Sequence, residues 1–256
     1  MEPLSSEEFY NRLARAFDVM TDWDSRLAHE MPFLLRVLKE RRAGSVLDTA
    51  CGTGWHAIAL ARKGFRTAGC DASPAMIEQA RVNAAKSGVP VRFEAADFSA
   101  MDVFGEVFDA VLCLGNSLPH LLTRAALGEA LGHMRARLRP GGVLILHNLN
   151  YDLRVKKQPR FFSANGHADA LVWRFADYGP EYITFHTALF ERKVEGEKAS
   201  WSVQVNSTLQ RPLLEKELDE ALEQAGFEKI RHFGGLDGSP FDREKSGDLV
   251  VVAVAE

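Results

Sequence analysis

The stretch from Val46 to Asp71 constrains the fold more than any other part of the sequence. It reads as a short apolar strand, a turn at Gly52-Thr53-Gly54, a helix, and a second strand ending on an acid. At such a strand-turn-helix junction, glycines let a ligand lie against backbone N–H groups. An acid that closes the second strand is placed to accept hydrogen bonds from a ribose diol. The segment therefore predicts a site for a nucleoside-like ligand, with Asp71 at the ribose.

The pattern of the chain after this segment predicts an α/β fold, because strands and helices alternate from Ser45 onward and such alternation gives a parallel sheet with helices on both faces. Helices are expected after the capping residues Ser73 and Thr123, and the second should stop at Arg139-Pro140-Gly141-Gly142. A last helix is expected over 212–225. Strands are expected near 45–49, 66–70, 91–95, 108–114, 142–147, 227–232 and 249–255.

Two regions lie outside this alternation. Two amphipathic helices precede the first strand, the first capped at Ser5 and the second kinked by Pro32 or beginning there, and they are placed to cover the ligand. Between Asp152 and Arg211 three β-rich runs predict a three-stranded antiparallel insertion that acts as a lid or a dimer surface. Trp201, Val203 and Val205 alternate there with polar residues, which predicts one buried and one wet face. The expected units are 1–44, 45–152, 153–211 and 212–256.

Composition narrows the class of partner. The 256 residues carry a net charge of -4, so the chain offers no basic field for nucleic acid, and a small molecule is the better expectation. Three cysteines without C-x-x-C spacing indicate free thiols in a reducing, cytoplasmic compartment. No apolar run approaches the length of a membrane span, and the acidic N-terminus does not resemble a signal segment. Composition leaves open whether the chain forms a homo-oligomer.

The glycine turn carries a specific family resemblance. The sequence D-x-A-C-G-T-G resembles the first motif of the class I S-adenosylmethionine (SAM) methyltransferases more than the G-x-G-x-x-G of dinucleotide enzymes. The resemblance implies a Rossmann-like seven-stranded sheet and SAM as cofactor, with S-adenosylhomocysteine as product. The alternatives are a nicotinamide oxidoreductase or a glycine-rich turn of another α/β domain. The motif implies cofactor contacts at Asp48, Ala50, Cys51, Gly52 and Gly54.

A second resemblance points to the glycine and sarcosine N-methyltransferases. The segment L-G-N-S-L-P-H-L at 114–121 is similar to a motif of that group, as are D-A-S-P-A-M at 71–76, N-Y-D at 150–152 and the Ser25-Arg26 pair. By this match Arg26 would pair with the SAM carboxylate, or else be a solvated helix arginine. The resemblance covers most of residues 9–152. It implies further cofactor contacts at Tyr10, Trp23, Ala72 and Leu114, the alternative for the two aromatic residues being that they fill the core.

The adenine end of the cofactor is expected beyond the third strand. Asp97 can accept the adenine amino proton there, and Phe98 offers a backbone N–H and a ring. Met76 can pack on the base. The plainer interpretations are a helix-capping Asp97 and a core Met76. His56, directly after the glycine turn, is expected to cap or face the cofactor.

One departure from the resembled group bears on the acceptor. Those enzymes carry H-R-N-Y-D, whose arginine grips a substrate carboxylate, whereas this chain has Leu149 at that place, and the expected tyrosine pair is replaced by residues 205–207. Leucine cannot pair with a carboxylate, so glycine is a poor substrate prediction. An amine acceptor remains favoured, because Asn116 keeps its place beside the methyl group and its amide oxygen can accept from an N–H.

The sequence therefore predicts a SAM-dependent methyltransferase that acts on a small molecule, with an amine nitrogen as the favoured acceptor and in-line displacement as the reaction. The alternative within enzymes is O-methylation with His120 or His147 as base and Tyr151 as a polar orienter. A SAM-binding regulatory protein without turnover is the alternative outside enzymes. No H-x-x-H, H-E-x-x-H or Cys/His cluster is present, so no metal is expected.

Overall fold

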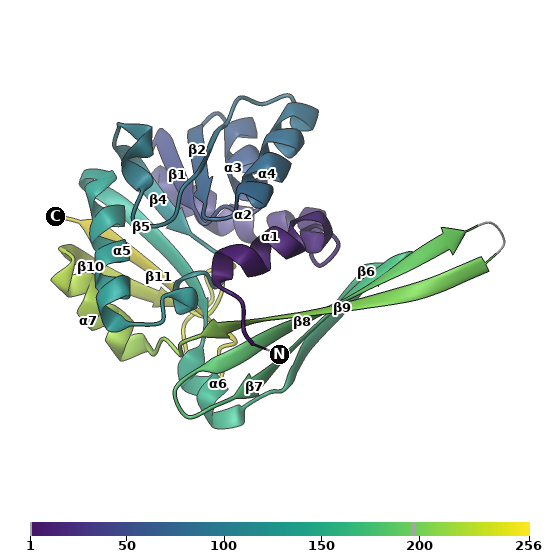
Figure 1. Cartoon of the computed structure of the whole chain (residues 1–256). Coiled ribbons are helices and arrows are strands. Elements are labelled where there is room, and N and C mark those ends of the chain that lie inside the picture. Colours follow the sequence, from purple (N-terminus) through teal and green to yellow (C-terminus); the bar gives the residue numbers. More distant parts are fainter. Residues whose placement is uncertain (1, 196–197) are drawn as a thin grey trace.

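The computed structural model describes residues 2–195 and 198–256, which form a seven-stranded sheet and a separate four-stranded sheet (Figure 1). The larger sheet has the order β10-β11-β5-β4-β1-β2-β3, and β11 runs in the direction opposite to its other six strands. The chain order reverses between β1 and β4, and ligands of α/β sheets bind at such a switch point. The strands are β1 Ser45–Thr49, β2 Arg66–Asp71, β3 Arg92–Ala95, β4 Phe108–Cys113, β5 Leu138–Leu149, β10 Phe227–Phe233 and β11 Asp248–Ala255.

Helices cover both faces of the larger sheet, as expected from the alternating pattern. Successive residues of β4 and β5 point to opposite faces: Val111 and Leu144 pack against α5 Arg124–Ala136 and α7 Glu215–Gln224, whereas Leu112 and Ile145 pack against α2 Trp23–Glu40. The helices α3 Trp55–Arg62 and α4 Pro74–Ser87 pack on β3 through Phe93. The sheet is therefore buried on both faces, and only its strand ends are available to a ligand.

The predicted capping residues begin their helices. The side chains of Ser5, Ser73 and Thr123 accept hydrogen bonds from the backbone N–H three residues on, at the starts of α1 Ser6–Phe17, α4 and α5. Pro32 lies in the interior of α2, so the idea that the helix begins there is wrong. Asp22 caps that helix instead by accepting from the Ser25 N–H.

The region after β4 departs from the expected boundaries. Helix α5 ends at Ala136, and β5 begins at Leu138, so the Arg139-Pro140-Gly141-Gly142 run lies inside the strand and does not stop the helix. Gly141 has φ +74°, a conformation that glycine adopts without strain, and the register with β4 shifts nearby. The α6 helix Tyr151–Lys157, capped by Asn150, was not expected. Short 3-10 turns occupy Met101–Phe104 and Leu118–His120.

The insertion has four antiparallel strands, so the prediction of three is wrong. Its order is β6-β7-β8-β9, and the first strand was missed because only its first two residues, Phe161 and Phe162, are large and apolar. Figure 1 shows α1 lying between this sheet and the larger one, with the β8-β9 hairpin projecting beyond the body. The strands are β6 Phe161–His167, β7 Ala170–Tyr178, β8 Ile183–Glu195 and β9 Lys198–Gln210.

The two faces of the insertion are the reverse of those predicted. Trp201 and Val203 were expected to be buried, yet they are 54% and 55% exposed. The opposite face packs on the N-terminal helix, because Val172 and Leu189 contact Phe9 of α1 there. Alternation correctly separated the two faces, but the sequence does not show which one α1 covers.

The three cysteines are buried free thiols in this structure. Across the described residues, no helix combines the length and apolar character needed to cross a membrane.

Candidate active site

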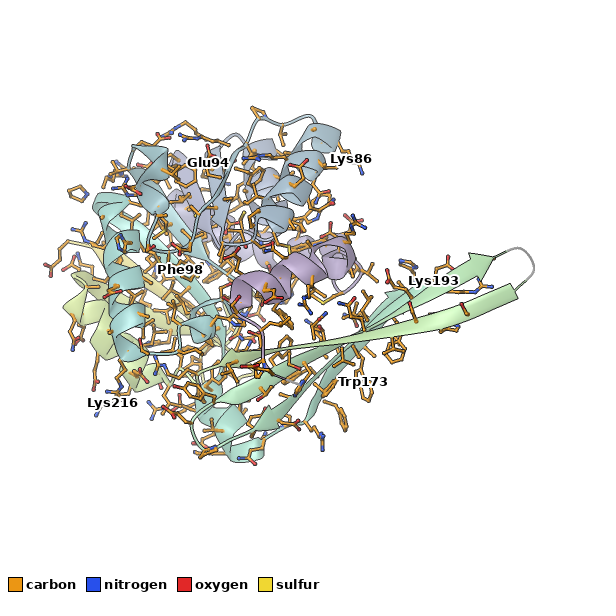
Figure 2. The ribbon with its side chains drawn as sticks, viewed as in Figure 1. Lys86, Glu94, Phe98, Trp173, Lys193 and Lys216 are labelled. Carbon is orange, nitrogen blue, oxygen red and sulfur yellow. The ribbon has the colours of Figure 1, made fainter. Side chains whose placement is uncertain are left out.

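A cavity of about 1070 Å³ lies where the strands β1, β2, β4 and β5 end, enclosed by α1, the start of α2 and the insertion. Nearly all the residues expected at the site contribute to its wall. They are Tyr10, Trp23, Arg26, Asp48, Ala50, Cys51, Gly52, Asp71, Ala72, Met76, Asp97, Phe98, Leu114, Asn116, His120 and His147. Figure 2 shows Phe98 in the loops at this end of the larger sheet.

Two expected residues lie behind the wall. A side chain at Gly54 would come within 2.6 Å of the Phe93 ring and 2.9 Å of Ala80, so this glycine lets the turn pack closely on β3 and α4. Tyr151 is fully buried and reaches the site through hydrogen bonds with Asn116 and Gln210. Both therefore position other groups, and a direct contact with a ligand is not their role in this structure.

Asp71 fastens the glycine turn to the end of β2. Its two carboxylate oxygens accept from the Gly52 and Ser73 N–H groups, each at 2.9 Å. Burial raises the pKa of Asp71, and the two N–H donors only partly offset that effect. Since a carboxylate has about four lone-pair sites, it retains acceptor capacity toward the cavity.

Asp48 is a buried acid that lacks a full set of partners. It is 1% exposed, and its Oδ2 has no hydrogen-bond partner among the described residues. Burial and the nearby Asp71 charge raise the pKa of Asp48 to about 8. A buried unpaired carboxylate is costly, and a cationic ligand group in the cavity would stabilise its ionised form.

Arg26 is held by Glu30 in a buried group that includes His56. Arg26 Nε donates to Glu30 Oε1 at 2.9 Å, and His56 Nε2 lies 2.6 Å from Glu30 Oε2. Burial alone would raise the pKa of Glu30, but His56 and Arg26 outweigh it and lower the value to about 2. Burial lowers the pKa of His56, and Arg26 forms an ion pair with Glu30. Glu30 was missed, although its i,i+4 spacing from Arg26 was visible in the sequence.

Asp18 is a second missed residue, and it joins the N-terminal helices to the glycine turn. Its carboxylate accepts from Trp23 Nε1 at 2.8 Å, Thr53 Oγ1 at 2.6 Å and Asn83 Nδ2 at 3.3 Å. These donors come from α2, the turn and α4. Only the folded arrangement brings them together, so no local sequence signal identifies Asp18.

A chain of hydrogen bonds crosses the acceptor side of the cavity. Asn116 Oδ1 accepts from the Leu149 N–H at 3.0 Å, and its Nδ2 donates to the Tyr151 hydroxyl, which donates to Gln210 Oε1. Gln210 Nε2 and the Tyr10 hydroxyl then both lie near His120 Nε2, at 3.4 and 3.2 Å. Gln210 was missed because it lies in the insertion, where the family resemblance thins out.

The two candidate bases differ in their surroundings. His120 Nδ1 faces the Leu209 carbonyl at 3.2 Å, and burial lowers the pKa of His120 to about 4, so its ring is neutral with its Nε2 lone pair already accepting. His147 Nδ1 accepts from the Gly115 N–H at 3.4 Å, and its Nε2 is 3.6 Å from Asp248 Oδ2.

At the adenine end, the Asp97 Oδ1 atom accepts from both the backbone N–H and the hydroxyl of Ser99. These bonds lower the pKa of Asp97 and fix a local turn, and the residue also contributes to the cavity wall. Met76 is 1% exposed and contributes both to the cavity wall and to the buried residues of α4, so the two interpretations of it are compatible.

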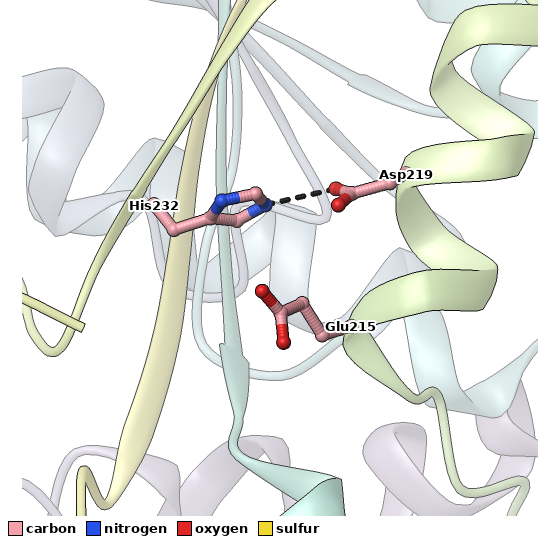
Figure 3. A group of neighbouring side chains, drawn as sticks. All are labelled: Glu215, Asp219 and His232. Carbon is pink, nitrogen blue, oxygen red and sulfur yellow. Dashed lines mark hydrogen bonds and ion pairs between the residues drawn. The ribbon is translucent and has the colours of Figure 1, made fainter. Parts of the chain in front are cut away.

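One group of side chains away from the cavity has the composition of a metal site. Glu215 and Asp219 of α7 and His232 of β10 bring ligand-type atoms within 4.8 Å of one another (Figure 3). However, His232 Nε2 pairs with Asp219 Oδ1 at 2.8 Å, and Glu215 is paired with Arg243. Because these groups satisfy one another, the cluster is explained without an ion.

Comparison with known proteins addresses the class of the domain. Residues 46–142 match the family described as "Methyltransferase domain". This chain contains a methyltransferase domain. A SAM-dependent methyltransferase from Clostridium acetobutylicum ATCC 824 has the same fold, with a TM-score of 0.79, 17% identity, and coverage of 96% of this chain and 98% of that one. The expected class I SAM methyltransferase fold is therefore confirmed.

The methyltransferase domain also has named relatives. The chain is 36% identical over 186 residues to the glycine/sarcosine N-methyltransferase of Parasynechococcus marenigrum (strain WH8102), covering 72% of this chain and 65% of the relative. The chain thus spans less than two thirds of that relative's length. The sugar N-methyltransferase KedS8 from Streptoalloteichus sp ATCC 53650 is similar in fold, with a TM-score of 0.67, 24% identity, and coverage of 100% of this chain and 95% of that one.

Proposed function

We propose that this protein transfers a methyl group from SAM to a nitrogen atom of a small-molecule amine. The observation that carries the proposal is the arrangement of Arg26, Asp48 and Asp71 around one cavity at the switch point of the sheet. The relative named above as a glycine/sarcosine N-methyltransferase and the fold neighbour named as a sugar N-methyltransferase both support nitrogen as the acceptor atom.

The residues present fit the charged and polar parts of SAM. Asp48, with its orphaned oxygen, suits the ammonium group, and Arg26 suits the carboxylate. Asp71 retains lone pairs for the ribose diol, while Asp97 and Phe98 border the space left for adenine. When bound, SAM supplies a methyl group on a positively charged sulfur. A nucleophile attacks the methyl carbon in line with the carbon–sulfur bond, and the sulfur is the leaving group.

The residues on the acceptor side orient and desolvate an amine. A neutral amine attacks without a strong base, so positioning and exclusion of water are the main requirements. The Asn116 amide is fixed by Leu149 and Tyr151, and its oxygen retains one lone pair for a substrate N–H. A hydroxyl acceptor would need deprotonation, for which His120 is poorly suited because its ring is engaged and its pKa is about 4.

Matched acceptors test the proposed reaction. The protein is incubated with SAM and with pairs of small molecules that differ only in carrying an amine or a hydroxyl, and formation of S-adenosylhomocysteine is measured. We expect turnover with members of the amine set and none with their hydroxyl partners. Turnover restricted to hydroxyl compounds would favour the alternative that uses His147, and SAM binding without any turnover would favour a regulatory protein.

We also propose that the insertion serves as the contact surface between two copies of this chain. The residues of its outer face, named here the outer patch, are Phe161, Trp173, Val194, Trp201 and Val203. The strand register puts them on one side of the sheet, and Phe161 stacks on Trp173 at 5.3 Å. Figure 2 shows Trp173 on the side of the sheet away from α1.

The area of the outer patch suits a second copy. Its members are 37% to 60% exposed. At about 150–250 Å² per aromatic side chain, the patch leaves roughly 500 Å² of apolar surface, more than half of the roughly 800 Å² per partner in a standard interface. Exposed apolar patches of this size mark contact sites, and a two-fold axis would bury the same face on both copies.

A further inference from the structure

Arg174 is a largely buried cation with no acidic partner. It extends from β7 into the cavity wall, and its Nε and Nη2 atoms both donate to one acceptor, Ser163 Oγ of β6, at 2.8 and 2.6 Å. Among residues 2–195 and 198–256, no carboxylate lies within ion-pair distance of its guanidinium. Burying an unpaired charge is costly, so the site is incomplete without an anion.

The charged and titratable groups around Arg174 do not supply that anion. Burial and the positive charge of Arg26 both act to lower the pKa of Arg174, and Tyr10 of α1 acts in the opposite direction. Arg26 is itself paired with Glu30, so its ion pair adds no free negative charge. A guanidinium has five N–H donors, and Arg174 therefore keeps donors that no described contact uses.

A second guanidinium lies on the same side of the cavity. Arg154 of α6 lies over the Phe162 ring at 4.2 Å and donates to the Tyr178 hydroxyl at 3.4 Å, and the structure gives it no ion pair with a described acid. The acids Asp48, Asp71 and Asp97 instead gather at the strand ends of β1, β2 and β3. The cavity is thus acidic toward the larger sheet and cationic toward the insertion.

We infer that Arg174 binds an anionic group of the methyl acceptor, so that the substrates are small amines that also carry a carboxylate. This inference rests on the proposed amine methylation and specifies its substrate class. Leu149 contributes to the same cavity without a charge, and Arg174 supplies a carboxylate partner from the insertion. An arginine fork pairs with a carboxylate through two parallel N–H···O bonds, which also fixes the orientation of the amine.

A carboxylate in this cavity has two sources, the acceptor and the methionine end of SAM, and a binding experiment separates them. Acetate is titrated by calorimetry into the protein alone and into the protein saturated with S-adenosylhomocysteine, with acetamide as the neutral control. We expect saturable acetate binding that persists in the saturated protein, weakens at least tenfold in Arg174→Gln, and is unchanged in Arg192→Gln. Arg192 is a matched control because it is an exposed arginine of the same sheet, paired with Asp169.

Acetate binding that disappears when S-adenosylhomocysteine is present would assign Arg174 to the cofactor carboxylate and overturn the inference. Equal binding of acetate by wild type and Arg174→Gln would overturn it as well. Because this readout needs no turnover, it separates failure of the inference from failure of the proposed methylation. Where amines are turned over, amino acids should exceed their carboxamides in kcat/KM by at least tenfold, and Arg174→Gln should remove that preference.

Discussion

At the scale of single residues, Asp71 links the glycine turn to the proposed ribose site. The substitution Asp71→Ala removes the acceptor of the Gly52 and Ser73 N–H groups along with the proposed ribose contact. We expect the dissociation constant for SAM to rise at least tenfold, which corresponds to about 1.4 kcal/mol. Calorimetric titration measures it, with Asp102→Ala as an exposed control outside the cavity. Unchanged affinity in a folded variant would show that the ribose lies elsewhere.

His120 gives the protein a specific sensitivity to acid. Its pKa falls from 6.5 to about 4 on folding, because burial disfavours the charged ring. A lowered pKa means that the unfolded chain binds the proton first, so this contribution to the free energy of unfolding is complete above pH 6.5 and is lost toward pH 4. We expect His120→Asn to flatten the loss of stability between these values in urea unfolding. Parallel pH profiles for the two proteins would contradict this assignment.

Residues at strand ends were predictable because the parallel sheet gathers them at one edge, as with Asp48, Asp71 and Asn116. The residues that connect the site to other elements were not predictable. Asp18 joins three elements that are distant in sequence, and Gln210 reaches Tyr151 from the far end of the insertion. Such contacts depend on tertiary packing, which no local pattern encodes.

At the scale of elements, most of the larger sheet and three strands of the insertion followed their sequence signals, whereas the start of β5 and the strand β6 did not. Caps at Ser73 and Thr123 begin helices as expected, since each side chain satisfies a free backbone N–H. Strand β5 forms across the Pro-Gly-Gly run, because it pairs with both β4 and β11. Strand β6 has weak patterning, and pairing with β7 fixes its place.

The outer patch leads to a prediction about assembly. We expect the wild-type protein to sediment as a dimer, and Trp201→Glu with Val203→Glu to sediment as a monomer, because both substitutions put charge into the proposed interface. Ser202→Glu is the matched control, since Ser202 lies between them on the opposite face of β9. A wild-type protein that is monomeric at tens of micromolar by analytical ultracentrifugation would contradict the proposed contact.

At the scale of the whole molecule, one cavity joins three parts of the chain. The larger sheet supplies acids, α1 and α2 supply Tyr10 and Arg26, and the insertion supplies Arg174. In the proposed function, the larger sheet and α2 recognise the cofactor, and the insertion recognises the acceptor.

The most direct test of the account is calorimetric titration of the protein with SAM and with S-adenosylhomocysteine. We expect both to bind with micromolar dissociation constants, because Asp71, Asp48 and Arg26 offer partners for their shared ribose, ammonium and carboxylate groups. NAD should not bind. Failure of both adenosyl compounds to bind a correctly folded protein would contradict the central claim that this cavity is a SAM site.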